Sequence, residues 1–116
     1  MLTRTLPFLL LCSTPFALAH PRSDVTGLYH SNWDDVRLQQ DGNRVTGTYV
    51  CCGGGTIEGT ISEGRTLRYR WNQPEAHGFG VWTIHAGRLE GTWGSGDESS
   101  GGRWDLTIAS EGQIAN

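Results

Sequence analysis

A short strand pattern that recurs four times constrains the fold of this chain more than any other feature of its sequence. The pattern has five positions: an aliphatic residue, a polar residue, a glycine, a threonine or leucine, and finally an aromatic or aliphatic residue. It occurs at Val25–Tyr29, Val45–Tyr49, Ile57–Ile61 and Leu89–Trp93. Alternation with a period of two is typical of half-buried β-strands, in which the aliphatic, glycine and terminal positions face one side.

Four further segments show the same alternation: Val36–Gln40, Thr66–Trp71, Gly78–His85 and Arg103–Ile108. Short turn sequences join consecutive strands, and no segment after residue 19 has a helical period. The sequence therefore predicts an all-β protein, an antiparallel up-and-down meander of about eight short strands. Closure into a small barrel removes the sheet edges and explains glycines at inward strand positions, whereas a flattened two-sheet sandwich is the alternative.

The first nineteen residues have the organisation of a secretory signal peptide. Arg4 supplies a positive charge, an apolar run follows, and Ala17-Leu18-Ala19 matches an A-x-A cleavage site. The apolar run is shorter than the ~20 residues that a membrane helix needs, and prolines interrupt it. We therefore expect a signal peptide over residues 1–19 and a single small domain over residues 20–116. The mature protein would be periplasmic or secreted, without a membrane span.

The charge balance argues against nucleic acid as a partner. Twelve carboxylates outnumber nine basic residues, the net charge is −3, and the arginines form no stripe. The carboxylates show no catalytic grouping, and neither a Ser-His-Asp signature nor a phosphate-binding loop is found. The sequence leans against an enzyme without deciding the question, and it indicates no cofactor.

Three segments, Val25–Tyr29, Leu38–Tyr49 and Gly78–Trp82, together resemble the avidin family of small secreted eight-stranded barrels. The resemblance implies a barrel with a ligand pocket, in which Tyr49 takes the position of the family's ligand-contacting tyrosine. It also implies that tryptophans surround the ligand, and the candidates are Trp71, Trp82 and Trp93.

The chain departs from the avidin family at polar positions of that pocket. Ser31 stands where the family has asparagine, with Asn32 one residue later, and Cys51 replaces a hydroxyl-bearing residue. The family's long closing loop is replaced by Cys52 and three glycines. Polar contacts give such sites their specificity, so the resemblance implies the fold and a pocket but not biotin as the ligand.

The aromatic residues have two interpretations. Five tryptophans in so short a chain suit core packing, and they also suit an aromatic-lined pocket or a flat sugar-binding surface. Trp33 differs from the others because it lies in a predicted turn, between Asn32 and Asp34, where a core role is not expected. Trp33 is therefore the leading candidate for contact with a ligand or a protein partner.

The adjacent pair Cys51 and Cys52 precedes three glycines, and the third cysteine, Cys12, would leave with the signal peptide. In an oxidising compartment the pair has three possible fates: a disulfide with each other, pairing with a second chain, or binding of a soft metal. We expect the bond between neighbours, because the glycines permit the tight bend. No metal site is assigned, although His20 at the mature N-terminus would offer copper an amine and an imidazole.

Three functions remain open at this point. The first is a non-catalytic binding module that holds a small ligand or partner through aromatic residues. The second is a periplasmic metal-binding or redox protein that uses Cys51, Cys52 and histidines such as His77. The third is a structural or inhibitor-type interaction domain without a pocket.

Overall fold

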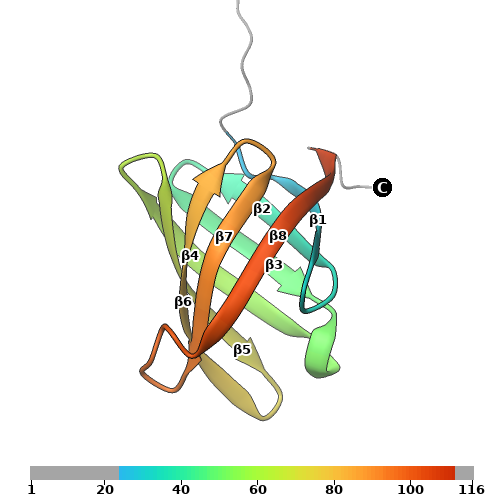
Figure 1. The fold of residues 1–116 in the computed structure, drawn as a ribbon, viewed down its shortest axis with the longest axis vertical. Helices are drawn as coiled ribbons and strands as arrows, with labels where there is room; N and C mark the ends of the chain where they lie inside the picture. Colours follow the sequence, from blue (N-terminus) through green and yellow to red (C-terminus); the bar gives the residue numbers. More distant parts are fainter. Residues whose placement is uncertain (1–23, 112–116) are drawn as a thin grey trace, which may run out of the picture.

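The computed structural model describes residues 24–111 and confirms the all-β prediction. Eight antiparallel strands, paired in chain order, close into one barrel (Figure 1). The strands are β1 (Gly27–Ser31), β2 (Val36–Asp41), β3 (Arg44–Tyr49), β4 (Gly55–Ser62), β5 (Thr66–Gln73), β6 (Ala76–His85), β7 (Arg88–Ser95) and β8 (Gly102–Glu111). A single 3₁₀ turn, η4 (Cys51–Gly53), links β3 to β4. The expected signal peptide and His20 lie outside the described residues.

Pairing between the first and last strands closes the barrel. β1 runs antiparallel to β8, with Tyr29 opposite Ile108 and Ser31 opposite Leu106, and the register shifts between Leu28 and Tyr29. A register shift of this kind bends a strand, which helps a sheet of few strands to close. The closed ladder excludes the two-sheet sandwich.

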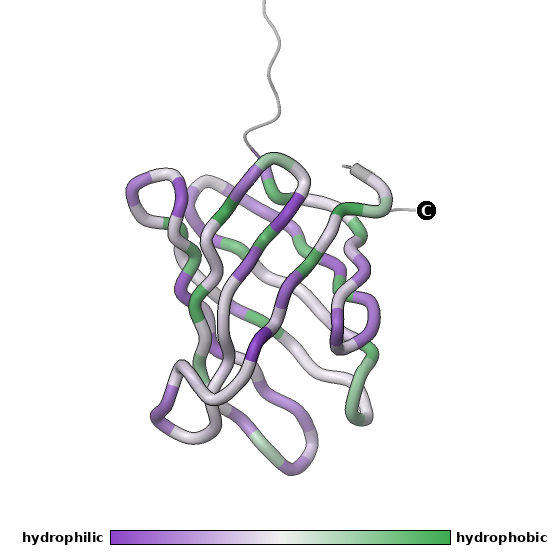
Figure 2. The backbone as a smooth tube through the Cα atoms, in the orientation of Figure 1, coloured by the Kyte–Doolittle hydropathy of each residue, from purple (hydrophilic) through white to green (hydrophobic). Residues whose placement is uncertain are grey.

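The core fills the barrel with the inward residues of every strand. Along each strand, buried apolar and exposed polar residues alternate, and Figure 2 shows this as alternating colours on the tube. Trp82, Leu67 and Val36 are completely buried, and no polar or charged residue is buried among the described residues. Burial of apolar side chains at about 25 cal/mol per Å² is the main stabilising contribution.

Glycines make room for aromatic rings that cross a neighbouring strand. A methyl group at Gly80 would overlap the ring of Tyr69, and one at Gly55 would overlap the ring of Tyr49. Each glycine belongs to the strand next to the tyrosine that it accommodates. These positions are therefore occupied by glycine because of close packing inside the barrel.

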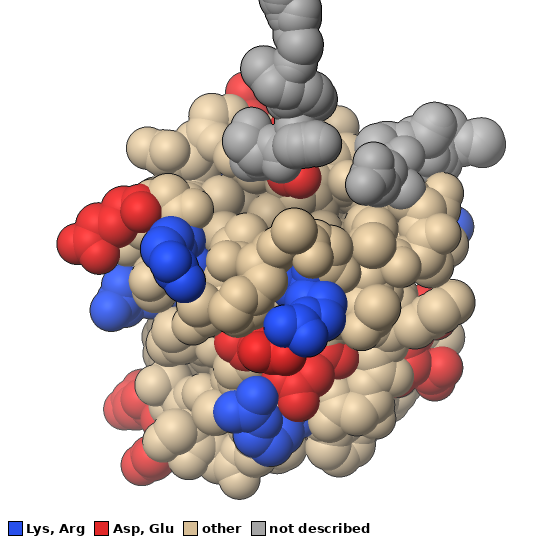
Figure 3. Space-filling view, turned by 45° about the horizontal axis from the view of Figure 1, so that its top comes forward, with Lys and Arg blue, Asp and Glu red and all other residues tan. Residues whose placement is uncertain are grey.

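The two ends of the barrel differ. One end, here called the loop end, carries the four connections 32–35, 50–54, 74–75 and 96–101. The other, here called the terminal end, carries the three remaining turns and the points at which the described chain starts and stops (Figure 1). Figure 3 turns the terminal end toward the viewer and shows basic and acidic groups side by side on that face.

Candidate functional site

A cavity of about 110 Å³ opens at the loop end of the barrel. Its walls are almost wholly apolar, and no carboxylate or histidine lines it. The lining residues come from β3, β5, β7, β8 and two connections; they are Trp33, Tyr49, Cys51, Cys52, Trp71, Gln73, Trp93 and Trp104. The structure thus brings together every ligand-contact residue expected from the sequence except Trp82, and it adds Gln73 and Trp104.

The aromatic rings of the pocket meet at right angles. Trp93 lies edge-on to Trp33, with ring centroids 5.8 Å apart and planes at 89°, and to Trp71, at 6.1 Å and 81°. Tyr49 makes the same kind of contact with Trp104, at 5.3 Å and 90°. Edge-to-face pairs of this geometry are favourable beyond their buried area. Rings in perpendicular planes flank the cavity on several sides, whereas parallel rings would flank it on two sides only.

Trp33 is held over the pocket by hydrogen bonds from its loop. Its backbone N–H donates to Ser31 Oγ at 3.0 Å, and its Nε1 donates to the carbonyl of Arg103 at 3.0 Å. Ser31 Oγ also accepts from Trp104 Nε1 at 3.1 Å. The Trp33 side chain nevertheless stays 41% exposed, so a tryptophan is fixed at the mouth without being buried.

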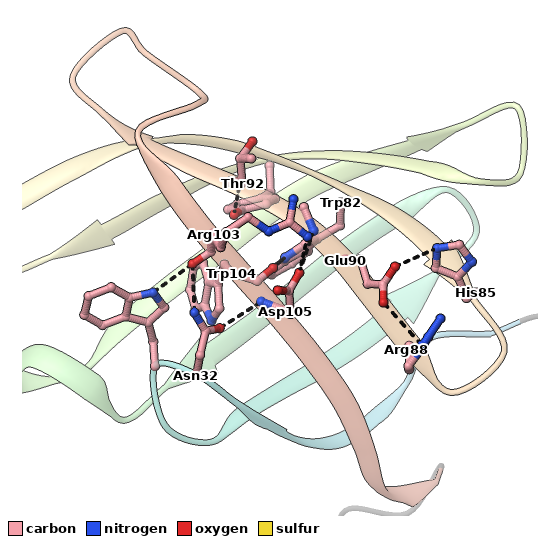
Figure 4. Close-up of polar contacts among 12 residues, drawn as sticks. Asn32, Trp82, His85, Arg88, Glu90, Thr92, Arg103, Trp104 and Asp105 are labelled. Carbon is pink, nitrogen blue, oxygen red and sulfur yellow. Dashed lines mark hydrogen bonds and ion pairs between the residues drawn. The ribbon is translucent and has the colours of Figure 1, made fainter.

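Asn32 fastens the same loop to β8 (Figure 4). Its Nδ2 donates to the carbonyl of Arg103 at 3.0 Å, and its Oδ1 accepts from the backbone N–H of Asp105 at 2.8 Å. The polar groups of Ser31 and Asn32 are thereby used within the protein. The mouth of the pocket is preorganised, and these two residues, which differ from the avidin pattern, serve to position the loop.

Tyr49 and Gln73 form the polar contact of the pocket. The Tyr49 hydroxyl donates to Gln73 Oε1 at 2.7 Å. Burial raises the pKa of Tyr49 to about 12, so its phenol stays neutral at physiological pH. The pKa of Tyr69, deeper in the barrel, is also raised by burial and, to a smaller extent, by Tyr49. Gln73 was not predicted as a site residue, although it is the last residue of β5 and lies two positions after the inward Trp71.

Trp93 carries an unsatisfied donor at the edge of the site. Its Nε1 is buried and has no hydrogen-bond partner among the described residues. A methyl group at Gly102, its neighbour on β8, would come within 2.9 Å of that nitrogen. An unpaired buried N–H costs on the order of 1–3 kcal/mol. The Trp93 indole therefore lies where it does because Gly102 leaves space for it.

Cys51 and Cys52 form part of the pocket wall. They lie in η4, where Cys52 has a positive φ of 65°, and the chain then turns through Gly53 and Gly54, also at positive φ. Their sulfur atoms are in contact. Strand β3 ends at Tyr49, and the turn that follows it brings both cysteine side chains to the cavity.

Trp82 lies in the core instead of the pocket. It is fully buried, its Nε1 donates to the carbonyl of Trp104 at 2.9 Å, and its ring stacks on Tyr69 at 4.0 Å. These contacts satisfy the side chain within the protein. Trp82 supports the floor of the site through Trp104 and is not among the lining residues.

Within residues 24–111, no three histidine, cysteine, aspartate or glutamate side chains gather closely enough to hold a metal ion. His30 is bonded instead to Asp35, with Nδ1 at 2.8 Å from Oδ1, and His85 lies beside Glu90. In the same part of the chain, no helix is both long and apolar enough to span a membrane.

Comparison of the chain with protein-family models, curated proteins and solved structures finds no match.

Proposed function

We propose that the chain is an exported binding module that holds a small ligand at the loop end of its barrel. One observation carries the proposal: an open cavity lined by four tryptophans and a tyrosine, with its loop fastened in place. A concave, mostly apolar site with few polar groups is the usual form of a small-molecule site. The lining contains no acid, base or charged nucleophile, which favours binding over catalysis.

Trp33 and Trp93 are the residues whose positions favour a ligand role over a structural one. Trp33 is held at the mouth while exposed, and Trp93 keeps an unpaired donor. Placing large apolar surface in water gives no stability to the fold, and an unpaired donor lowers it. The avidin-like interpretation, proposed at the level of fold, also locates the ligand at this end.

We also propose that residues 1–19 direct export and that Cys51 and Cys52 bond to each other in the oxidising compartment. The apolar run and the A-x-A site support the first point, and the contact between the sulfur atoms supports the second. Intact mass of protein recovered outside the cytoplasm tests the export proposal. A mature chain starting at His20 is expected, and retention of the full chain would contradict it.

Tryptophan fluorescence of the exported protein tests the binding proposal. Small neutral ring compounds, such as phenol and indole derivatives, and small organic cations are titrated separately. We expect a saturable change in emission with at least one set. The Trp33→Ala variant should lose that change, while Phe79→Ala should keep it, because Phe79 is an exposed aromatic on β6 outside the pocket. Absence of a saturable response to both sets would contradict the proposal.

A further inference from the structure

The loop end is acidic around an uncharged cavity. Its four connections contain no arginine or lysine, and they carry five carboxylates, Asp34, Asp35, Glu75, Asp97 and Glu98. Of these, only Asp35 has an ion-pair partner among residues 24–111, the imidazole of His30. At the other end and on the walls, arginines are interspersed with the acids, as in the pairs Arg44–Glu58 and Arg88–Glu90.

This charge distribution selects the sign of a ligand. The carboxylates of the connections would repel an anion, and the pocket has no basic group to bind one. A cation is instead attracted to the mouth. Two arginines adjoin pocket-lining tryptophans in sequence, Arg70 beside Trp71 and Arg103 beside Trp104, and both are exposed and absent from the lining. The guanidinium of Arg103 is also paired with Asp105 at 2.7 Å. No positively charged side chain of the lining opposes a cation.

The pocket itself is built to hold a cation by its rings. Five aromatic side chains line it, and the faces of tryptophan and tyrosine rings attract a positive charge, more strongly when the charge is desolvated. Perpendicular rings surround a roughly spherical group on several sides. A flat ring ligand would instead favour two parallel walls.

The scarcity of hydrogen-bond acceptors in the pocket indicates which kind of cation fits it. A primary ammonium has three N–H donors, each costly to bury without an acceptor. The two side-chain oxygens of the pocket, Gln73 Oε1 and the Tyr49 hydroxyl, are hydrogen-bonded to each other, so few acceptor positions remain for a buried ammonium. A quaternary ammonium has no N–H donor and presents methyl groups to apolar walls, so it adds no further unpaired donor to this lining.

The cavity volume limits how much of the ligand enters. At about 110 Å³ the cavity is smaller than the ~300–1,000 Å³ of sites that enclose whole small molecules. It therefore takes one compact head group, and the rest of the ligand lies outside at the acidic mouth.

We propose that the loop end recognises a trimethylammonium head group of a small organic cation. The inference rests on the proposed binding function and narrows its ligand to a chemical class. The charge at the mouth favours a cation, the aromatic lining and the scarcity of acceptors favour one without N–H donors, and the small volume admits only a compact head group.

Calorimetric titration with a matched ligand pair tests the inference. Choline is compared with 3,3-dimethyl-1-butanol, which replaces the charged nitrogen by carbon and keeps the shape. Choline is expected to bind at least about tenfold more tightly, since both ligands pack on the rings but only the charged one gains cation–π attraction. Equal affinity, tighter binding of the neutral compound, or no detectable binding of choline would overturn it. If neutral ring compounds still bind in any of these cases, the general binding function stands.

Two further measurements distinguish a free organic cation from a lipid head group and test the role of the acidic mouth. Phosphocholine, the form present on lipids, adds a phosphate that would face the acidic loops, so it is expected to bind more weakly than choline. Raising the salt concentration from about 20 to 500 mM should weaken choline binding and leave the neutral compound unaffected. Tighter binding of phosphocholine, or a salt-independent choline affinity, would contradict the role of the acidic mouth.

A pair of variants tests whether the rings carry the preference. Trp33→Leu keeps an apolar side chain and removes one ring, so the affinity for choline should fall about tenfold while that for the neutral isostere changes little. Phe79→Leu, outside the pocket, should change neither. Equal losses for both ligands in Trp33→Leu would show that the residue acts by shape alone and would contradict the inference.

Discussion

Tryptophans inside the barrel and at its loop end have different environments. Trp82 is completely buried, its Nε1 is bonded to the carbonyl of Trp104, and its ring stacks on Tyr69. At the loop end, Trp33 is 41% exposed and Trp93 has an unpaired buried Nε1. The interior satisfies each aromatic group within the fold, whereas the loop end leaves ring surface and a donor unused. That difference distinguishes residues that stabilise the barrel from residues that we propose to contact a ligand.

The largest expected effect on stability comes from removing a tryptophan ring from the barrel interior. Trp82→Ala removes a fully buried ring and leaves a cavity, so the free energy of unfolding should fall by about 3–5 kcal/mol. Equilibrium unfolding in denaturant, with Trp33→Ala as the matched control, measures the difference. Similar losses in the two variants would mean that the two tryptophans have the same structural role.

Alkaline pH should also lower the stability of the fold through two buried tyrosines. Burial raises the pKa of Tyr49 from 10.0 to about 12, and that of Tyr69 is raised as well. Above pH 10 the unfolded chain loses phenolic protons that the folded chain retains, so unfolding becomes more favourable. This contribution to stability is fully present below pH 10 and disappears as the pH rises through the folded-state pKa.

Thermal melts at pH 8, 10 and 11 measure this effect. The midpoint should fall above pH 10, and the fall should be smaller in Tyr49→Phe. A midpoint that stays flat to pH 11 would exclude burial as the cause, and a Tyr49→Phe variant as sensitive as the native protein would assign the effect to Tyr69 instead of Tyr49.

The cysteine pair should matter little to global stability. A bond between neighbours closes almost no loop, so the entropic stabilisation of a long-range bridge is missing. Replacing both Cys51 and Cys52 with serine should change the free energy of unfolding by no more than ~1–2 kcal/mol, against ~2–5 kcal/mol for a long-range disulfide.

Intact mass with and without an alkylating agent identifies the state of the pair, and denaturant unfolding gives its energetic effect. Two alkylated thiols in freshly exported protein, or a disulfide-linked dimer, would contradict the bond between neighbours. A larger loss of stability in the serine variant would show that η4 supports the core.

The smallest effect on stability is expected at the mouth. Trp33→Ala removes a side chain that is partly in water, together with its hydrogen bond to the carbonyl of Arg103. That carbonyl still accepts a hydrogen bond from Asn32. The cost should be about 0.5–1.5 kcal/mol, yet ligand-induced fluorescence should disappear. A stability loss as large as that of Trp82→Ala would place Trp33 in the structural core.

The strands could be predicted because alternation is a local property. Most observed strands extend the expected ones by a residue or two, as in β6, which begins at Ala76 instead of Gly78. The exceptions are β8, which ends three residues later than expected, at Glu111, and β1, which begins two residues later, at Gly27. Alternation states which face a side chain occupies but not how far along the barrel it lies. Trp71, two residues from the loop end of β5, therefore reaches the pocket, whereas Trp82, three residues from the terminal end of β6, lies in the core.

Other parts of the site depend on contacts between distant segments. The contacts of Asn32 with β8 join residues more than seventy positions apart, and no local pattern indicates them. Cys52 faces the pocket because the chain leaves the strand conformation in η4, where Cys52 has a positive φ. The following glycines indicated a bend at this point but not its direction. Counting residues from each predicted turn would have separated Trp104 and Trp71 from Trp82.

Indole N–H signals in a two-dimensional ¹H–¹⁵N spectrum compare the two regions within one sample. The chain has five tryptophans, one signal each, and choline is titrated into the labelled protein. The signals of Trp33, Trp71 and Trp93 should shift together and saturate, while that of Trp82 stays in place because Trp82 is fully buried and does not line the cavity. A Trp82 shift as large as the others, or no shift at Trp33 and Trp93 with any ligand that binds, would contradict a binding site at the loop end.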